Sequence, residues 1–291
     1  MNRSPIPTKD EIVGLIPFYF DPLSSDYLRA IKKLKKVIHE IGNYAGKLVV
    51  VDDGANLDKS NFPTTDLFIR LNKNKGKAEA VRRGLKRILN SGWKIKYIIQ
   101  IDGDNDYPPS NIPNLLKKIG SIRESSKPIM VIGDRYPEEL KKINVYRKNV
   151  LLFGEEIAAT MGYRARDLFA GLRVYNNKFA EKFLKLSKSE RYGLEFEQLI
   201  IAFLSSGSVF SVFLAKCRPR NTYTLKNKIL QNFRIPKLYG AKLKAKGLHS
   251  LVSASNKIVS EMETGSPAFN LIFNGRILNF IRKNNGYTLI D

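Results

Sequence analysis

Apolar residues follow two kinds of spacing along the first half of the chain. Continuous apolar runs are typical of strands that are buried on both faces, and they occur over residues 11–20, 47–54, 97–104 and 128–135. Helical spacing of apolar residues occurs over 24–42, through Ala78, Val81, Leu85 and Ile88, and over 111–119. Strands that alternate with helices in this way predict a mostly parallel sheet with helices on both faces.

The second half of the chain is less regular. The elements expected there are a helix over 148–161, a loop over 166–173, a helix over 177–186 and a helix with a following strand within 195–215. Beyond about residue 225 the chain is very basic, and helical spacing returns over 248–262 and 267–283. Because the chain is long for one average domain, we predict a core domain over 1–225 and a basic, helical C-terminal extension over 226–291.

One uncharged segment, Leu199–Ala215, approaches the length of a membrane-spanning helix. Two features argue against a span. The sequence SSGS interrupts the segment, and Glu195 and Glu197 precede it. We therefore expect a buried helix, a break at Gly207 and then a strand, with no transmembrane helix.

Composition narrows the partners of the chain. Lys and Arg number 50 against 27 Asp and Glu, a net charge of +23 that favours a nucleic acid, an anionic membrane or a phosphorylated small molecule. The single cysteine, Cys217, excludes an internal disulfide, and with two histidines it argues against a structural zinc site. Since no apolar signal segment opens the sequence either, we expect a cytoplasmic protein in a reducing compartment.

Charged residues gather where the expected strands end. Asp21 follows the first strand, Asp52 and Asp53 the second, Asp102 and Asp104 the third, and Asp134 with Arg135 the fourth. Ligands of open α/β sheets bind beyond the carboxyl ends of the strands. Because independent surface charges would not gather repeatedly at one edge, we expect the binding site there.

Asp102, Asp104 and Asp106 form a cluster in the sequence QIDGDNDYPP. Carboxylates this close repel each other unless a cation neutralises them, and hard oxygen ligands suit Mg²⁺ or Mn²⁺. An acidic turn is the alternative, because Asp, Asn and Pro are common turn residues. The cluster alone does not decide between a metal site and a turn.

Two further segments suit a phosphorylated ligand. In VVVDDGANLDKS, carboxylates at a strand end and Gly54 in a tight turn suit hydrogen bonds to a base or a ribose. In NKNKGKAEAVRRG, Gly76 permits close backbone approach and Lys77 places a cation at a helix start, where free amide groups favour phosphate. A strand-terminating turn and a solvated basic helix are the respective alternatives.

Together these segments resemble family 2 glycosyltransferases of the GT-A fold, most closely the dolichyl- or polyprenyl-phosphate mannosyltransferase branch. The resemblance runs from Pro17 to about Lys226, through PFYFD, DDGANLD, NKGKAEA, DGDNDYPP, GDRY and RDLFAGLR in that order. It implies an α/β catalytic domain with a Rossmann-like, mostly parallel sheet flanked by helices. Asp21 stands where the family has Glu, and Ala55 where it has Ser.

The resemblance also implies a role for each matching residue. The nucleotide-sugar donor is expected at Pro17, Tyr19, Asp21, Asp53, Lys77, Asp102 and Gly103. Metal ligands are expected at Asp102, Asp104 and Asp106, with Mg²⁺ or Mn²⁺ as cofactor. Catalytic roles are expected for Asp104, Arg147 and Asp167. The acceptor phosphate is expected at Arg135, Arg147, Arg173, Arg220 and Lys226.

The acceptor half of the resemblance is looser than the donor half. After the last core strand, RNTYTLK keeps Arg220 and Lys226 at the family's spacing but lacks its Gly and Ser. The family's acidic residue in YGLEFEQL has no unique register. Spacing to Gly207 selects Gln198, whereas residue type selects Glu195 or Glu197.

The resemblance implies an inverting, metal-dependent transfer of a hexose from a GDP- or UDP-sugar. We expect a polyprenyl or dolichyl phosphate as acceptor, because it is already anionic and needs no strong base. A hydroxyl acceptor is the alternative and would need a base such as Asp167. The lysine-rich 226–246 stretch either seats the enzyme on the cytoplasmic face of an anionic membrane or is a solvated surface.

Two other classes of protein compete with this interpretation. A nucleic-acid-binding protein on a degenerate transferase fold fits the net charge. However, the basic residues are not interleaved with aromatic residues, and the acids at the strand ends would repel phosphates. A nucleotidyltransferase would need a glycine-rich signature near the first strand, and LIPFYFDP does not contain one. We therefore expect no nucleic acid partner.

Overall fold

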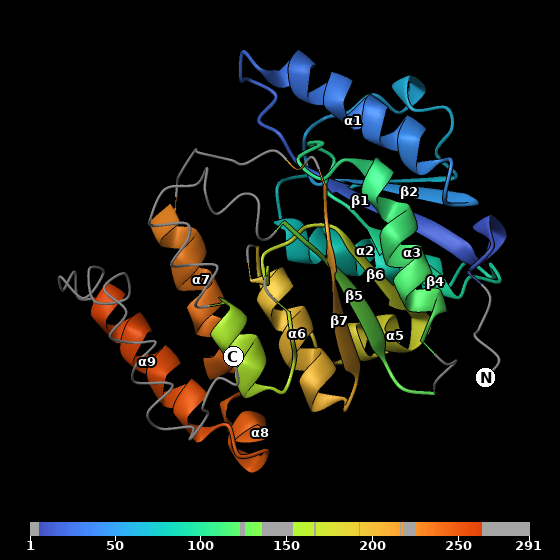
Figure 1. Ribbon diagram of the computed structural model, residues 1–291. Coiled ribbons are helices and arrows are strands. Elements are labelled where there is room, and N and C mark those ends of the chain that lie inside the picture. The colour runs from blue at the N-terminus through green and yellow to red at the C-terminus, as the bar shows by residue number, and fades with distance from the viewer. Residues whose placement is uncertain are drawn as a thin grey trace.

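A seven-stranded sheet forms the centre of the protein (Figure 1). The computed structural model describes residues 6–122, 126–135, 154–165, 167–191, 193–215, 217 and 225–263. The strand bounds are Ile12–Phe18 (β1), Lys47–Asp52 (β2), Leu67–Arg70 (β3), Tyr97–Gln100 (β4), Ile129–Asp134 (β5), Arg173–Asn176 (β6) and Ser208–Phe213 (β7). The strands lie in the order β3-β2-β1-β4-β6-β5-β7. β6 runs antiparallel to both of its neighbours, and the other neighbouring pairs are parallel.

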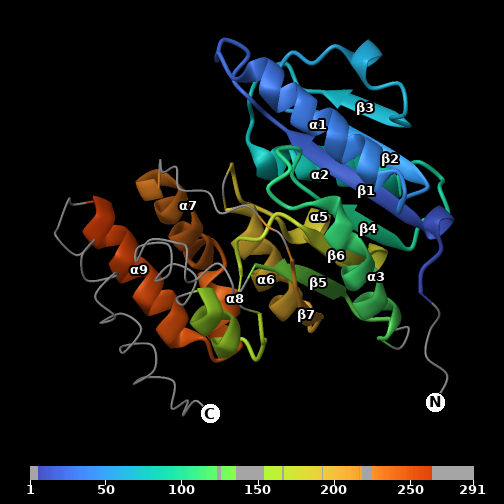
Figure 2. The same cartoon turned by 45° about the horizontal axis from the view of Figure 1, so that its top comes forward.

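Helices cover both faces of this sheet (Figures 1 and 2). The helix bounds are Tyr27–Ile41 (α1), Lys77–Leu89 (α2), Ile112–Gly120 (α3), Asn177–Leu186 (α5), Leu194–Leu204 (α6), Leu225–Leu238 (α7), Gly240–Ala245 (α8) and His249–Glu263 (α9). Residues 154–160 are also helical. Helices α2, α5 and α6 pack beside one another on one face, and α1 and α3 lie on the other. α7 packs against α6, and α9 packs against α7 and α8.

The apolar pattern of the sequence decides which sides of these elements are buried. All seven residues of β1 are buried, as in a strand covered on both faces. In α1 the buried residues recur at helical spacing, at Ala30, Leu34, Val37, Ile38 and Ile41. The lysines of α1 lie on its other side, so the helix covers the sheet and presents positive charge outward.

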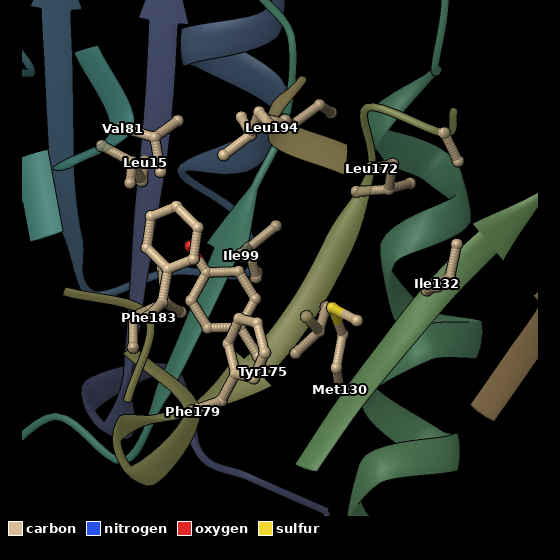
Figure 3. Close-up of a cluster of buried hydrophobic side chains, with 14 of the residues drawn as sticks. Leu15, Val81, Ile99, Met130, Ile132, Leu172, Tyr175, Phe179, Phe183 and Leu194 are labelled. Carbon is tan, nitrogen blue, oxygen red and sulfur yellow. The ribbon is translucent and has the colours of Figure 1, made fainter. Parts of the chain in front are cut away.

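Aromatic residues of β6 and α5 fill the core beside the first strands (Figure 3). Tyr175, Phe179 and Phe183 are fully buried and follow one another at steps of four residues. The ring centroids are 5.0 Å apart for Tyr175 and Phe179, and 6.3 Å apart for Phe179 and Phe183. They lie near Leu15 of β1 and Val81 of α2. Truncation of one such aromatic residue to Ala costs roughly 3–5 kcal/mol, so this cluster fixes α5 and the chain that leads into α6.

The strands and helices expected in the first half of the chain are confirmed, as are the helix over 177–186 and the helix, break and strand within 195–215. The sequence does not predict β3 and β6. β3 is only partly buried, and its apolar run, Leu67 to Ile69, is too short to identify a strand. β6 carries Arg173 and ends at Asn176, whose side chain caps α5 at the Phe179 N–H, so the segment looks like a polar loop.

The structure describes only part of the helices predicted in the second half of the chain. α9 confirms the helix over 248–262, and residues 154–160 form the described part of the helix expected over 148–161. The helix expected over 267–283 lies outside the described residues. The division of the chain at residue 225 stays a prediction. No helix within the described ranges combines the length and the apolarity that crossing a bilayer requires.

Candidate active site

The carboxyl ends of β1, β2 and β4 bring their following loops together at one edge of the sheet (Figure 1). These strands are parallel neighbours, so residues that follow them lie close together. The backbone N–H of Asp53, just after β2, donates to the carbonyl of Phe18 at the end of β1, at 2.9 Å. Asp102 lies two residues beyond the end of β4. The edge predicted to bind the ligand is thus the edge that carries Asp53 and Asp102.

Asp52 shapes the turn after β2. Its side chain is fully buried, and its two carboxylate oxygens accept hydrogen bonds from the N–H groups of Ala55, at 2.6 Å, and Leu57, at 2.9 Å. The guanidinium of Arg70, on β3, lies 3.4 Å from the same carboxylate. These contacts give Asp52 a structural role in holding the turn.

Asp53 connects that turn to the loop before α2. Its Oδ1 accepts from the N–H of Lys75 at 2.7 Å, and its Oδ2 from the N–H of Gly76 at 2.8 Å. Burial raises the pKa of Asp53, and the two backbone hydrogen bonds offset part of this rise. The loop that presents Lys77 is therefore anchored on β2. The predicted contact between Asp53 and a base stays a prediction.

Gly76 allows the start of α2 to approach a distant segment. Its φ angle of 92° lies in the region that favours glycine, and a Cβ at this position would lie 2.4 Å from the Cα of Arg191. The carbonyl of Arg191 accepts from the N–H of Ala78 at 3.2 Å. Only glycine fits here, and its backbone places Lys77 at the first position of the helix.

Lys77 lies between two carboxylates at the centre of this edge. Its Nζ is 2.6 Å from Oδ1 of Asp102 and 2.5 Å from Oε1 of Glu195. Burial by itself lowers the pKa of Lys77, but the attraction of Asp102 and Glu195 outweighs it and raises the pKa above the usual range. The ammonium group therefore stays charged at neutral pH. We call these three residues the Lys77 triad.

The triad also contacts the loop before β6. A Cβ on Gly171 would lie 2.1 Å from Oδ2 of Asp102, so the RDLFAGLR segment needs glycine where it meets the carboxylate. The backbone carbonyl of Glu195 accepts from Nη1 of Arg173 at 3.0 Å. Segments from β4, α2, α6 and the loop before β6 thus converge on Asp102.

The acidic cluster suits a metal ion with two protein carboxylates. Among the described residues, no three Asp, Glu, His or Cys side chains converge on one point, so Asp102, Asp104 and Asp106 do not form the three-carboxylate group expected from sequence. Asp106 is buried, and its N–H donates to Oδ1 of Asp104 at 3.0 Å. Asp102 and Asp104 are partly exposed. Mg²⁺ is commonly bound by one or two carboxylates with substrate phosphates completing its shell, so this pair fits such an ion.

Arg135 and Asp167 form a buried ion pair behind the cluster. The Arg135 Nε donates to Oδ2 of Asp167 at 2.5 Å, and Nη2 donates to Oδ1 at 3.1 Å. Asp167 is fully buried and Arg135 is 8% exposed. The guanidinium also lies 4.8 Å from the ring centre of Tyr107, just after the acidic cluster. The two residues that sequence assigns separately to acceptor binding and catalysis are thus brought together as one bidentate pair.

Arg173 does not have the position expected of an acceptor ligand. It is fully buried in β6, and its guanidinium donates to the carbonyls of Ala170 at 3.0 Å, Leu168 at 2.5 Å and Glu195 at 3.0 Å. Burial lowers the pKa of Arg173. Its hydrogen-bond donors therefore hold the 168–170 loop and the start of α6, and the assignment of Arg173 to an acceptor phosphate is corrected on this ground.

Glu195, Glu197 and Gln198 are the three candidates for the family's acidic residue in α6, and their side chains have different partners. Glu195 contacts Lys77. Glu197 is fully buried and accepts hydrogen bonds from Ser187, Lys188, Ser189 and Tyr239. Gln198 donates from Nε2 to Oε1 of Gln100 at 2.8 Å. Glu195 is therefore the candidate whose side chain contacts Lys77. The sequence alone does not distinguish it from Glu197 and Gln198.

The remaining predicted residues lie in β1, in the exposed loop after it, in α7 or outside the described part of the chain. Pro17 is buried within β1, Tyr19 is 44% exposed, and Asp21 is exposed with Oδ1 accepting from the N–H of Leu23 at 3.0 Å. Lys226 lies in the first turn of α7. Arg147 and Arg220 lie outside the described residues.

Comparison with known proteins decides the family. The sequence model of glycosyl transferase family 2 matches residues 15–184, which span β1 to α5 and contain Lys77, Asp102 and Asp104. The chain belongs to glycosyl transferase family 2. It is therefore an enzyme, a glycosyltransferase. Relatives of this glycosyltransferase include two uncharacterized proteins of Methanocaldococcus jannaschii. One is 31% identical over 51% of this chain and 68% of its own length, and the other is 28% identical over 67% and 76%.

Solved structures confirm the fold of this family 2 glycosyltransferase. Glucosyl-3-phosphoglycerate synthase from Mycobacterium tuberculosis is similar with a TM-score of 0.56, at 16% identity over 79% of each chain. Mannosyl-3-phosphoglycerate synthase from Rubrobacter xylanophilus is similar with a TM-score of 0.53, at 16% identity over 81% of this chain and 74% of that one. The mostly parallel, helix-flanked sheet is thus the GT-A fold that the sequence predicts.

Proposed function

We propose that this enzyme transfers a hexose, with inversion, from a UDP- or GDP-sugar to an acceptor that carries a phosphate, and that the acceptor is a polyprenyl phosphate. The observation that carries the donor half is the Lys77 triad, with Nζ of Lys77 2.6 Å from Asp102 and 2.5 Å from Glu195 at the ligand-binding edge of the sheet. A cation between two carboxylates is poised to exchange one of them for a diphosphate oxygen when the donor binds.

The diphosphate of a nucleotide sugar is negatively charged, and its binding site must neutralise this charge. Asp102 and Asp104 are the residues that would hold Mg²⁺ or Mn²⁺, and such an ion, when bound, supplies Lewis-acid stabilisation of a diphosphate leaving group. Lys77 adds a fixed positive charge in a partly buried site, where electrostatic attraction is stronger than in bulk water. One similar structure, of the M. tuberculosis synthase with a TM-score of 0.53, was solved with Mn²⁺, UDP-glucose and glycerol 3-phosphate, which supports this donor class.

The choice of a phosphate acceptor rests on the burial and the hydrogen bonds of Asp167. A hydroxyl acceptor needs a base to remove its proton, whereas a phosphate monoester is already anionic. Asp167 is fully buried, and both of its oxygens accept from Arg135. Both oxygens of this carboxylate are thus directed at the guanidinium, so Asp167 is placed to support Arg135 and not to take a proton from an acceptor hydroxyl. This favours an anionic acceptor that Arg135 helps to attract and that needs no protein base.

A small phosphorylated acid is the second candidate acceptor. The similar synthases take their names from 3-phosphoglycerate, so a phosphate-bearing acceptor without a lipid is consistent with the same fold. The two candidates share the phosphate and differ in solubility. Phase partition of the product therefore separates them.

The test is a transfer assay with a panel of radiolabelled UDP- and GDP-sugars, Mn²⁺ and a membrane lipid extract or 3-phosphoglycerate. We expect label to move into the organic phase with one sugar. Label that enters only a water-soluble product would replace the lipid acceptor with the small acid. Unchanged transfer by Asp104→Ala would show that the metal assignment is wrong.

A further inference from the structure

Exposed leucines lie beside a basic stripe at the N-terminal end of α1. Leu23, in the loop before the helix, is 93% exposed, and Leu28, in its first turn, is 71% exposed. Leu28, Lys32 and Lys35 recur at i, i+4 and i+7 and are all exposed, so they lie along one side of the helix. We call Leu23, Leu28, Lys32 and Lys35 the α1 surface. Arg29 and Lys36 are exposed and flank it.

The leucines of the α1 surface lie at the same edge of the sheet as the Lys77 triad. The loop that carries Leu23 follows the carboxyl end of β1 and projects at the top left of Figure 1. The hydroxyl of Tyr27 donates to the carbonyl of Ala55 at 2.5 Å and so attaches the start of α1 to the turn after β2. A flat surface, such as a membrane, that binds the two leucines would therefore lie next to the edge of the sheet that carries the Lys77 triad.

The chemistry of the α1 surface fits an anionic phospholipid layer. Single exposed apolar residues are common, but two large ones next to a one-sided row of lysines match an element that inserts apolar side chains below anionic headgroups. Asp21 and Asp26 are also exposed in this loop, and the cations of the helix outnumber them. A nucleic acid would account for the lysines and leave the leucines unexplained.

We propose that the α1 surface docks this enzyme on an anionic membrane, with Leu23 and Leu28 entering the lipid layer and Lys32 and Lys35 contacting the headgroups. This docking deepens the proposed function, because it places the ligand-binding edge of the sheet within reach of a lipid phosphate. It does not depend on that function, since an enzyme with a soluble acceptor could bind the membrane in the same way.

Vesicle flotation without any sugar donor tests the proposal separately from catalysis. The full chain is mixed with vesicles of phosphatidylcholine alone or of phosphatidylcholine with phosphatidylglycerol. We expect flotation with the anionic vesicles, and partition that is lower by roughly tenfold or more in Lys32→Glu/Lys35→Glu, because each lysine near an anionic surface contributes about 1 kcal/mol. We expect a similar loss in Leu23→Ser/Leu28→Ser, because leucine side chains leave the lipid.

Two matched variants serve as controls. Lys178→Glu/Lys182→Glu makes the same charge change at exposed lysines of α5, on the other face of the sheet from α1, and Ile6→Ser/Phe213→Ser removes two other exposed apolar side chains. We expect both controls to float as the unchanged chain does. Equal losses in test and control variants, or no flotation of the unchanged chain, would overturn the proposal. Loss in the lysine variant alone, together with salt-sensitive binding to single-stranded nucleic acid, would overturn it in favour of a nucleic acid.

Discussion

Glu195 and Glu197 lie two positions apart in α6 and contact different parts of the protein. Glu195 faces Lys77 at the ligand-binding edge, at 2.5 Å. Glu197 is fully buried, and its Oε1 accepts from the N–H groups of Lys188, at 2.5 Å, and Ser189, at 2.7 Å. Glu195 therefore faces the proposed donor site, whereas Glu197 holds the chain between α5 and α6. The same substitution should therefore lower transfer activity at Glu195 and stability at Glu197.

For Glu195→Leu we expect transfer to fall by about 100-fold, the scale of removing one preorganised electrostatic group from an active site. The thermal midpoint should change little, because Lys77 keeps Asp102 as a partner at 2.6 Å. Transfer assays and thermal unfolding of the same preparation measure both quantities. A large drop in the thermal midpoint with unchanged transfer would assign Glu195 to the fold alone.

For Glu197→Leu we expect the free energy of unfolding to fall by about 2–4 kcal/mol. The substitution keeps the approximate volume but removes the acceptor of the buried N–H of Ser189 and of the partly buried N–H of Lys188. Denaturant unfolding measures this loss. If Glu197→Leu is as stable as the unchanged chain, the hydrogen bonds around Glu197 do not hold this segment.

At the scale of elements, β4 and α6 are joined by two links. At the edge, Lys77 connects Asp102 to Glu195. Below it, Oε1 of the buried Gln100 accepts from Gln198 at 2.8 Å and from the hydroxyl of Tyr175 at 3.2 Å. Gln100 lies two positions before Asp102, and Gln198 lies one helical turn after Glu195. The lower link therefore sets the spacing of the two carboxylates around Lys77.

For Gln198→Leu we expect unchanged or slightly higher stability together with roughly tenfold lower transfer, because a misplaced group in a preorganised site is costly. The buried Oε1 of Gln198 has no hydrogen-bond partner among the described residues, so its removal also removes a desolvation cost. Parallel measurement of unfolding and of transfer separates the two effects. Full transfer in a folded Gln198→Leu would show that this link does not position the triad.

The elements differ in how far the sequence predicts them. Helices such as α1 and α2 and fully buried strands such as β1 carry their periodicity within one segment, so the sequence predicts them. β6 is held by its neighbours β4 and β5, and its buried Arg173 is tolerated because backbone carbonyls, one of them in α6, accept its hydrogen bonds. Likewise, the sequence places Lys77 at a helix start and Asp102 after a strand end, but the contact of Lys77 with Glu195 joins positions 118 residues apart. Such partners depend on tertiary packing.

At the scale of the whole molecule, the helices after residue 225 pack on the catalytic core. The hydroxyl oxygen of Tyr239 lies 2.6 Å from Oε1 of Glu197 and 2.7 Å from the carbonyl oxygen of Leu186, both within hydrogen-bond distance of its one proton. Ile235 lies so close to Gly193 that a Cβ there would be 2.4 Å from its side chain. These contacts couple the predicted extension to the chain that precedes α6.

For Tyr239→Phe we expect the free energy of unfolding to fall by about 1–2 kcal/mol, because the change removes a hydroxyl that donates to a buried carboxylate. Burial and the neighbouring Glu197 raise the pKa of Tyr239, so the hydroxyl stays protonated and the loss should not vary between neutral and mildly alkaline pH. Denaturant unfolding at several pH values measures this. No loss at any pH would indicate that α7 and α8 do not depend on this contact.

We propose above all that the Lys77 triad and the neighbouring acidic pair bind a nucleotide sugar together with a divalent metal. Isothermal titration calorimetry of the full chain with UDP-glucose and GDP-mannose tests it most directly, in Mn²⁺ and in EDTA. We predict that one of them binds in Mn²⁺ only, at least about tenfold more weakly in Lys77→Met, and unchanged in the control Lys86→Met, which alters an exposed lysine of the same helix. Binding that is equal in all three proteins, or equal with and without metal, would contradict the claim.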